Sequence, residues 1–247
     1  MRWKFILGLL TTCAVLMSMS YTMLIPFLPM YLIQDLGVVK ADVDMWSGAI
    51  FAITFLVSGI MAPIWGALAD KKSRKLIALR AGFCLAITYF LGGLVTNPWE
   101  LLGVRFIQGL SAGLWPALLA IISVESPKLK LGFCMGVMQG GMTAGGVLGP
   151  LFGGLLADQF GMRMAFFIAA AALFLITLAL LFFVKEEPRK PDSNAKPVKI
   201  WDFSLCKIPA VKRMLICAGV VQLTILMQQP IMPLTWLSCR VRWSESS

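Results

Sequence analysis

Histidine is absent from this 247-residue sequence, and charged residues make up only 14% of it. Without histidine, the chain has neither histidine-dependent catalysis nor histidine metal ligation. The six cysteines show no paired spacing and fall mostly inside apolar stretches, so neither a disulfide framework nor a zinc site is indicated. No motif for phosphate chemistry is present. These absences predict a protein that is not an enzyme and that uses no metal and no cofactor.

Apolar residues, by contrast, are abundant: hydrophobic types make up 59% of the chain, and the mean hydropathy is +0.83. A transmembrane helix needs roughly 20 consecutive, mostly apolar residues. We therefore predict an all-α integral membrane protein. The candidate spans cover residues 5–32, 46–69, 76–95, 101–122, 131–157, 164–184 and 215–233, of which the last is the weakest.

The basic residues, which give a net charge of +10, are divided among alternate loops. They cluster at 2–4, 71–75, 128–130 and 185–207, whereas the other loops contain only Lys40 and Arg163. This division excludes the contiguous basic face that a nucleic-acid partner would need. By the positive-inside rule it predicts a multi-pass protein with a cytoplasmic N-terminus. A cleaved signal peptide is the alternative for the first stretch, but the apolar run to Leu32 is too long for one.

A short motif occurs twice in the sequence. The run from Gly66 to Arg74 resembles the run from Gly154 to Arg163, at an offset of 88 positions (154 − 66). Each copy follows the second of three spans, and because three is odd, the second unit must be inverted relative to the first. We predict a six-helix transporter bundle of two inverted three-helix repeats over residues 1–184. The alternative is chance similarity between short Gly/Ala-rich stretches.

The apolar pattern stops after residue 184. Residues 185–213 contain Pro188, Pro191 and Pro197 among many charges, which predicts a cytoplasmic linker. Within it, residues 200–211 could instead form a short helix on the membrane surface. Residues 214–247 would hold a seventh span and a tail.

Four motifs together resemble the major facilitator superfamily, and specifically its twelve-span bacterial multidrug:proton antiporters. They are the loop from Gly66 to Lys75, the pair Pro26 and Pro29, the run Arg105-Phe-Ile-Gln-Gly109, and the glycine-rich run from Gly141 to Gly154. Ser73 departs from the family's usual glycine, which puts the tight turn there in doubt. The resemblance covers the family's first six spans, its central loop and its seventh span.

The resemblance implies proton-coupled efflux of amphipathic drugs by alternating access, in the bacterial inner membrane. The partners would be a small-molecule substrate, protons and membrane lipid, and an intact transporter would add a C-terminal six-helix half. One alternative is a metabolite or sugar exporter of the same superfamily. Another is a nonfunctional or regulatory membrane fragment.

The tail from Trp236 departs from the family pattern. A frameshift near Leu234 would explain this departure and would leave the chain alone inactive.

The fifth span contains the most specific part of the resemblance, an element that marks antiporters in this superfamily. We predict an antiporter hinge there, because glycines let helices approach closely and proline bends a helix. A static packing face is the alternative. The hinge residues are Gly145, Gly149, Pro150, Gly153 and Gly154.

Charges in or near the spans mark further candidates. By resemblance, Arg105 takes part in proton coupling; snorkelling to the external surface is the alternative. Asp70, Arg74 and Glu125 would form a cytoplasmic latch, or else a solvated ion pair worth about 0 to 1 kcal/mol. Arg80, one turn into the third span, is expected to snorkel.

Methionine and aromatic side chains suit a pocket that repacks around many shapes, although most such residues in a span face lipid or neighbouring helices. The predicted substrate-cavity residues are Tyr21, Phe27, Tyr31, Trp115, Met138, Gln139 and Met142.

Overall fold

The computed structural model describes residues 2–71, 73–184 and six positions between 213 and 220. The predicted linker and seventh span therefore lie almost entirely outside the described residues. The chain divides into two compact units, Met1–Lys196 and Pro197–Ser247, and the predicted six-helix bundle lies in the first.

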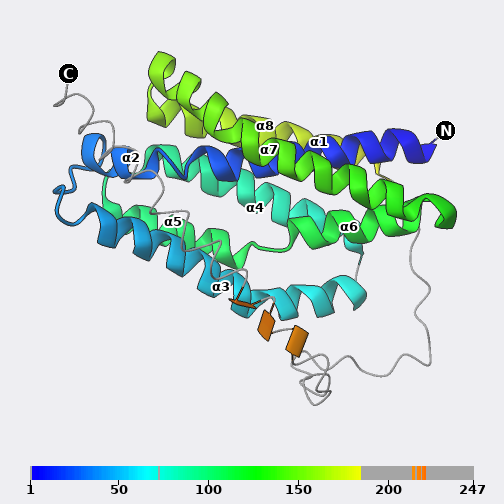
Figure 1. Ribbon diagram of the computed structural model, residues 1–247. Helices are drawn as coiled ribbons and strands as arrows, with labels where there is room; N and C mark the ends of the chain where they lie inside the picture. The colour runs from blue at the N-terminus through cyan, green and yellow to red at the C-terminus, as the bar shows by residue number, and fades with distance from the viewer. Residues whose placement is uncertain (1, 72, 185–212, 215, 218, 221–247) are drawn as a thin grey trace. The chain divides into compact units, whose positions relative to one another are not determined.

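The described part of this unit is built from helices alone, which confirms the predicted all-α class (Figure 1). Six helical segments are long and apolar enough to cross a membrane, and they match the first six predicted spans. The helices are α1 (Arg2–Met23), α2 (Leu28–Gln34), α3 (Val43–Lys71), α4 (Arg74–Leu94), α5 (Pro98–Leu110), α6 (Leu114–Glu125), α7 (Leu131–Phe160) and α8 (Met162–Phe183), with a short 3₁₀ helix at Lys128–Lys130.

The first predicted span is not one helix, which corrects the expectation of a continuous run to Leu32. Helix α1 ends at Met23, and α2 begins at Leu28. Pro26 has no backbone N–H to donate to the Thr22 carbonyl, which instead accepts from Ile25 at 3.2 Å in a tighter turn. The N-terminal membrane-spanning segment is therefore Trp3–Met23.

The packing of the helices follows the predicted inverted repeat. The most extensive pairs are α1 with α7, α4 with α8, and α3 with α5. Counted as spans, with α5 and α6 together forming the fourth, these are 1 with 5, 3 with 6, and 2 with 4. Exchanging spans 1, 2 and 3 with spans 4, 5 and 6 converts the first pair into the third and returns the second pair to itself. This is the pattern that two inverted three-helix repeats produce.

The two copies of the repeated motif both lie where one long helix passes into the next, at the α3–α4 and α7–α8 connections. Ser73, which replaces the family's glycine, is the N-cap of α4: its hydroxyl accepts from the backbone N–H of Leu76 at 3.1 Å. Its backbone is extended, with φ −67°. The serine therefore starts the helix by capping it rather than by adopting a left-handed turn.

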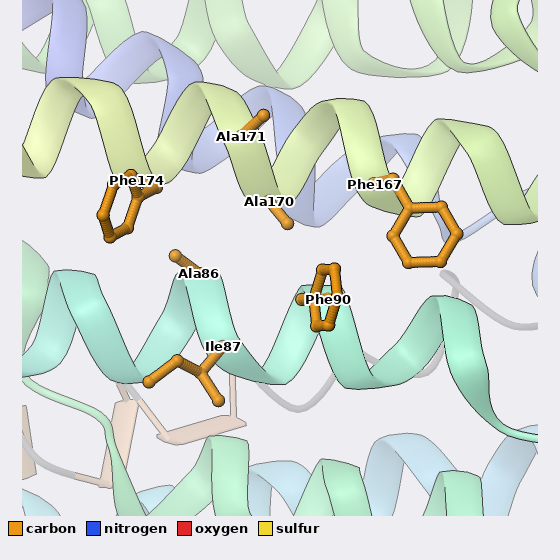
Figure 2. Close-up of a pocket in the computed structure, with 7 residues that line it drawn as sticks. All are labelled: Ala86, Ile87, Phe90, Phe167, Ala170, Ala171 and Phe174. Carbon is orange, nitrogen blue, oxygen red and sulfur yellow. The ribbon is translucent and has the colours of Figure 1, made fainter.

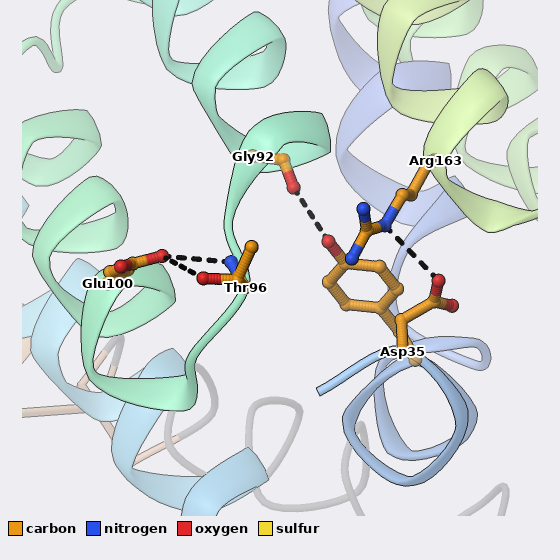
Figure 3. Close-up of polar contacts among 6 residues, drawn as sticks. Asp35, Gly92, Thr96, Glu100 and Arg163 are labelled. Carbon is orange, nitrogen blue, oxygen red and sulfur yellow. Dashed lines mark hydrogen bonds and ion pairs between the residues drawn. The ribbon is translucent and has the colours of Figure 1, made fainter. Parts of the chain in front are cut away.

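One end of the bundle, here called the basic end, gathers the start of α1, the α3–α4 and α6–α7 connections and the end of α8 (Figure 1). The rings of Phe5 and Phe183 lie 5.3 Å apart there, and the Lys75 ammonium donates to the Leu181 carbonyl at 2.6 Å. At the opposite end, Arg163 pairs with Asp35 at 3.3 Å, and the Thr96 N–H donates to Glu100 at 2.8 Å (Figure 3).

Candidate functional site

The most deeply enclosed charge among the described side chains is Arg105, on α5. Its side chain is only 7% exposed, and its guanidinium donates to the Gln108 side-chain oxygen at 2.7 Å. Spacing of three residues places both on one face of the helix. No ion pair to Arg105 is found among the described residues, and its Nε atom is buried without a partner. The snorkelling alternative is therefore wrong, because the guanidinium turns into the bundle.

Two tyrosines on other spans lie near this pair. Tyr89 on α4 is 2% exposed, and its hydroxyl lies close enough to interact with Arg105 and Gln108 without forming a hydrogen bond. Tyr21, on α1, also has a buried, unbonded hydroxyl, and it lies within electrostatic range of Tyr89 and Arg105. We call Tyr21, Tyr89, Arg105 and Gln108 the polar cluster. It joins three spans around a buried cation whose described neighbours are all neutral, an arrangement typical of functional rather than structural polar groups in membranes.

The fourth span is interrupted just beyond the polar cluster. Helix α5 ends at Leu110, and α6 begins at Leu114 after Gly113, whose φ of +119° suits only glycine well. Pro116 cannot donate to the Ala112 carbonyl, so the break frees a backbone acceptor within the span.

Two side chains from other spans satisfy the freed carbonyls. The Trp65 indole donates to the Leu110 carbonyl at 2.9 Å, and the Arg80 guanidinium donates to the Ala112 carbonyl at 3.1 Å. The guanidinium also stacks on the Trp65 ring, 3.2 Å from its centroid. The expectation that Arg80 snorkels to the surface is wrong, because its guanidinium binds the Ala112 carbonyl and the Trp65 ring inside the protein.

The glycines of the fifth span pack directly against α1. Gly141, Gly145, Gly149 and Gly153 recur every four residues along α7, and a Cβ on any of them would collide with α1. At Gly149 such a Cβ would lie 2.6 Å from the Met19 carbonyl oxygen, and at Gly153 it would lie 2.6 Å from the Met23 side chain. Glycine therefore sets the distance between these two spans.

The other two predicted hinge residues behave differently. Helix α7 continues through Pro150, which lies inside it, and a Cβ on Gly154 would meet only the Phe27 ring, at 3.3 Å. We call Gly141, Gly145, Gly149 and Gly153 the glycine face. Its close packing against α1 is observed in the structure, whereas hinge motion about it stays a prediction.

The predicted latch also stays a prediction. Glu125 ends α6 and Arg74 begins α4, but no ion pair of Glu125 is found among the described residues. The side chain of Asp70 lies outside the described part of the chain.

The structure separates the predicted substrate residues. Tyr31 is fully buried, and its hydroxyl donates to the Gly92 carbonyl at 3.0 Å, which gives it a structural role; this bond is the dashed line that ends at Gly92 in Figure 3. Met138 is fully buried in the hydrophobic core at the basic end, while Gln139 is exposed. Phe27, Trp115 and Met142 are half-buried. Of the seven, Tyr21 alone belongs to the polar cluster.

A cavity of about 380 Å³ lies between α4 and α8 (Figure 2). Its walls are entirely aromatic and aliphatic, and none of the predicted substrate residues lines it. The lining residues are Ala86, Ile87, Phe90, Phe167, Ala170, Ala171 and Phe174.

No site role was predicted from the sequence for Tyr89, Gln108 or Trp65, although Gln108 belongs to the motif from Arg105 to Gly109. The spacing of Gln108 from Arg105 was a usable signal, because residues three apart on a helix are neighbours. Tyr89 and Trp65 lie in apolar spans, where their partners become visible only once the helices are packed.

Comparison with known proteins agrees with this fold. The model of the Major Facilitator Superfamily matches residues 10–240. The multidrug resistance protein MdtG of Citrobacter koseri is 42% identical over 186 residues, which cover 75% of this chain and 46% of that protein. The corresponding protein of Yersinia enterocolitica is 40% identical over 187 residues, covering 75% and 45%.

Solved structures show the same fold at lower identity. A bacterial homologue of the human lysosomal transporter Spinster superposes with a TM-score of 0.67 at 23% identity, covering 83% of this chain and 48% of the other. A human organic anion transporter (TETRAN) gives 0.60 at 21% identity, covering 72% and 47%. This chain thus spans about half the length of the curated relatives it matches. On its fold, its motifs and the match over residues 10–240, the chain belongs to the Major Facilitator Superfamily.

Proposed function

We propose that this chain supplies the N-terminal six-helix half of a secondary transporter that exports amphipathic drugs in exchange for protons. The observation on which the proposal chiefly depends is the polar cluster around Arg105. A buried guanidinium is costly in a membrane and is by default a functional group. The similarity to multidrug resistance proteins, at 40% to 42% identity, supports drugs as the substrate class.

Arg105 is suited to sensing protonation because its described neighbours leave its charge uncompensated. An acidic side chain that approaches the cluster would be held in its ionised form by this cation, and protonation of that acid would release the attraction. In the intact transporter, such an acid would come from the second half. Loading and release of a proton would then change the energy of one conformation relative to the other.

The glycine face of α7 would supply the moving contact. Backbones in direct contact slide or rotate with few side chains to rearrange, and packing is what holds helices together in lipid. Gly145, Gly149 and Gly153 are fully enclosed at this contact. In the proposal, α7 shifts against α1 as the central cavity changes the side to which it opens.

The distribution of charge supports the proposed placement in the bacterial inner membrane with the N-terminus in the cytoplasm. The basic end has Lys4, Lys75, Lys128 and Lys130 among its described residues. The opposite end contains mostly acids, which are Asp35, Asp42, Asp44, Glu100 and Asp158. Under the positive-inside rule the basic end faces the cytoplasm.

A chimera tests the proposal. Residues 1–184 would replace the corresponding half of the Citrobacter koseri relative, and the product would be expressed in bacteria that lack their own drug exporters. We expect dye efflux that stops when an uncoupler collapses the proton gradient. The relative expressed intact is the positive control. A chimera that is inserted at the same level but exports no dye would contradict the proposal.

A further inference from the structure

The break in the fourth span is held by a pair of side chains that no part of the proposed mechanism uses. Trp65 reaches it from α3 and Arg80 reaches it from α4. Together they tie two spans of the first repeat to the opening span of the second.

Irregular backbone inside a membrane persists only where protein groups satisfy its polar atoms. The break frees the Leu110 and Ala112 carbonyls, and each accepts one hydrogen bond from this pair, at 2.9 Å and 3.1 Å. Pro116 removes the backbone donor that would normally reach the Ala112 carbonyl, and the Arg80 guanidinium takes its place.

The stack between the two side chains makes them act as one unit. The guanidinium carbon lies 3.2 Å from the centre of the Trp65 ring, which orients the fork of N–H groups toward Ala112. Gly113 also faces this side chain: a Cβ added there would lie 3.6 Å from the Cβ of Trp65. Through its bond to the Leu110 carbonyl and its stack on Arg80, the indole contacts both the break and the cation.

The position of the break fixes the position of the polar cluster. Gln108 lies one turn before the break and Arg105 about two turns before it, so a shift at Ala112 rotates both side chains. From these contacts we infer that Trp65 and Arg80 are positioning residues, which hold the fourth span broken at Ala112 and thereby set the place of Arg105 in the bundle. The functional consequence rests on the proposed role of Arg105.

The test measures how firmly α5 and α6 are held relative to each other, as the spread of distances between them, in the 247-residue chain itself. Spin labels would be placed at Ile107 on α5 and Val124 on α6, which are 46% and 64% exposed, in a background without the native cysteines. Pulsed electron paramagnetic resonance gives the distribution of distances between them. We expect one narrow peak for the parent chain and its loss in Trp65→Phe and in Arg80→Met.

Conservative and distant variants distinguish the loss of these specific contacts from a general destabilisation of the helix bundle. Arg80→Lys keeps a donor for the Ala112 carbonyl and should recover much of the narrow peak. Trp99→Phe, at the far end of α5, and Arg163→Met, at the start of α8, should leave it unchanged. If Arg80→Met does not fold, Trp65→Phe still decides, because it removes one N–H and keeps an aromatic ring.

An unchanged peak in folded Trp65→Phe and Arg80→Met would overturn the inference, as would equal broadening by Trp99→Phe and Arg163→Met. The measurement needs no transport, so a negative result leaves the proposed function standing. Failure of the chimera, conversely, leaves this result intact.

Discussion

Arg105 donates a 2.7 Å hydrogen bond to Gln108 in a site where no described carboxylate accompanies it. Because the amide of Gln108 is neutral, it leaves the charge of Arg105 uncompensated. That charge can therefore attract an acidic group that approaches it reversibly. A permanent ion pair would instead compensate it. This relationship separates the site from an ordinary structural salt bridge such as that of Arg163 with Asp35, whose side chains are 43% and 27% exposed.

The Gln108 amide should contribute measurably to stability. In Gln108→Ala the buried guanidinium loses its side-chain partner, and we expect the free energy of unfolding to fall by about 1.5 to 3 kcal/mol, as for hydrogen bonds to charged groups. Reversible unfolding in mixed micelles would measure it. Gln139→Ala, on the exposed face of α7, is the matched control and should change stability by less than about 0.5 kcal/mol. Equal effects of the two would contradict this account of the site.

Glycine should be required on one face of α7 only. Gly149→Ala would drive a methyl group into the backbone of α1, and we expect a loss of about 1 to 3 kcal/mol. Gly140→Ala meets open space and should be neutral or stabilising by about 0.4 to 1 kcal/mol. The larger Gly149→Leu should also abolish export by the chimera. Unchanged drug resistance in an inserted Gly149→Leu protein would count against the hinge.

Two tyrosines should respond in opposite ways to loss of the hydroxyl. Tyr31→Phe removes the bond to the Gly92 carbonyl and should cost about 0.5 to 1.5 kcal/mol. Tyr21→Phe removes a buried hydroxyl that has no bond, so stability should stay the same or rise. If Tyr21→Phe destabilises the chain as much as Tyr31→Phe, the assignment of their roles is wrong.

Membrane topology is testable with reporter fusions. A reporter that is active only in the cytoplasm should work when fused after Lys75 or Lys190 and should fail after Asn97. The reason is that basic loops stay inside. Activity at Asn97 would reverse the proposed orientation.

The first six spans could be predicted from sequence because a membrane-spanning helix must be long and apolar. The glycine contacts were visible too, since Gly141 to Gly153 repeat at the spacing that lines one helix face. The helix breaks in the first and fourth spans were harder to predict. Pro26 and Pro116 are visible in the sequence as possible helix breakers. Both, however, lie in continuous apolar stretches whose composition favours a single helix.

Contacts between spans account for what sequence reasoning missed. Whether Arg80 reaches the surface or the interior depends on the distance to Ala112 and Trp65, which belong to other spans. Tyr31 and Tyr21 are the same residue type, yet one hydroxyl found a carbonyl and the other did not. Periodicity along one helix contains no information on either outcome.

The most direct test of the central claim is proton-driven transport that depends on Arg105. The chimera would be reconstituted in liposomes, and dye export would be followed with and without an imposed pH gradient. We predict export that accelerates with the gradient in the parent, weaker coupling in Arg105→Lys, which keeps the charge but loses the planar fork, and no response in Arg105→Ala. Export by Arg105→Ala that still follows the gradient as in the parent would contradict the account.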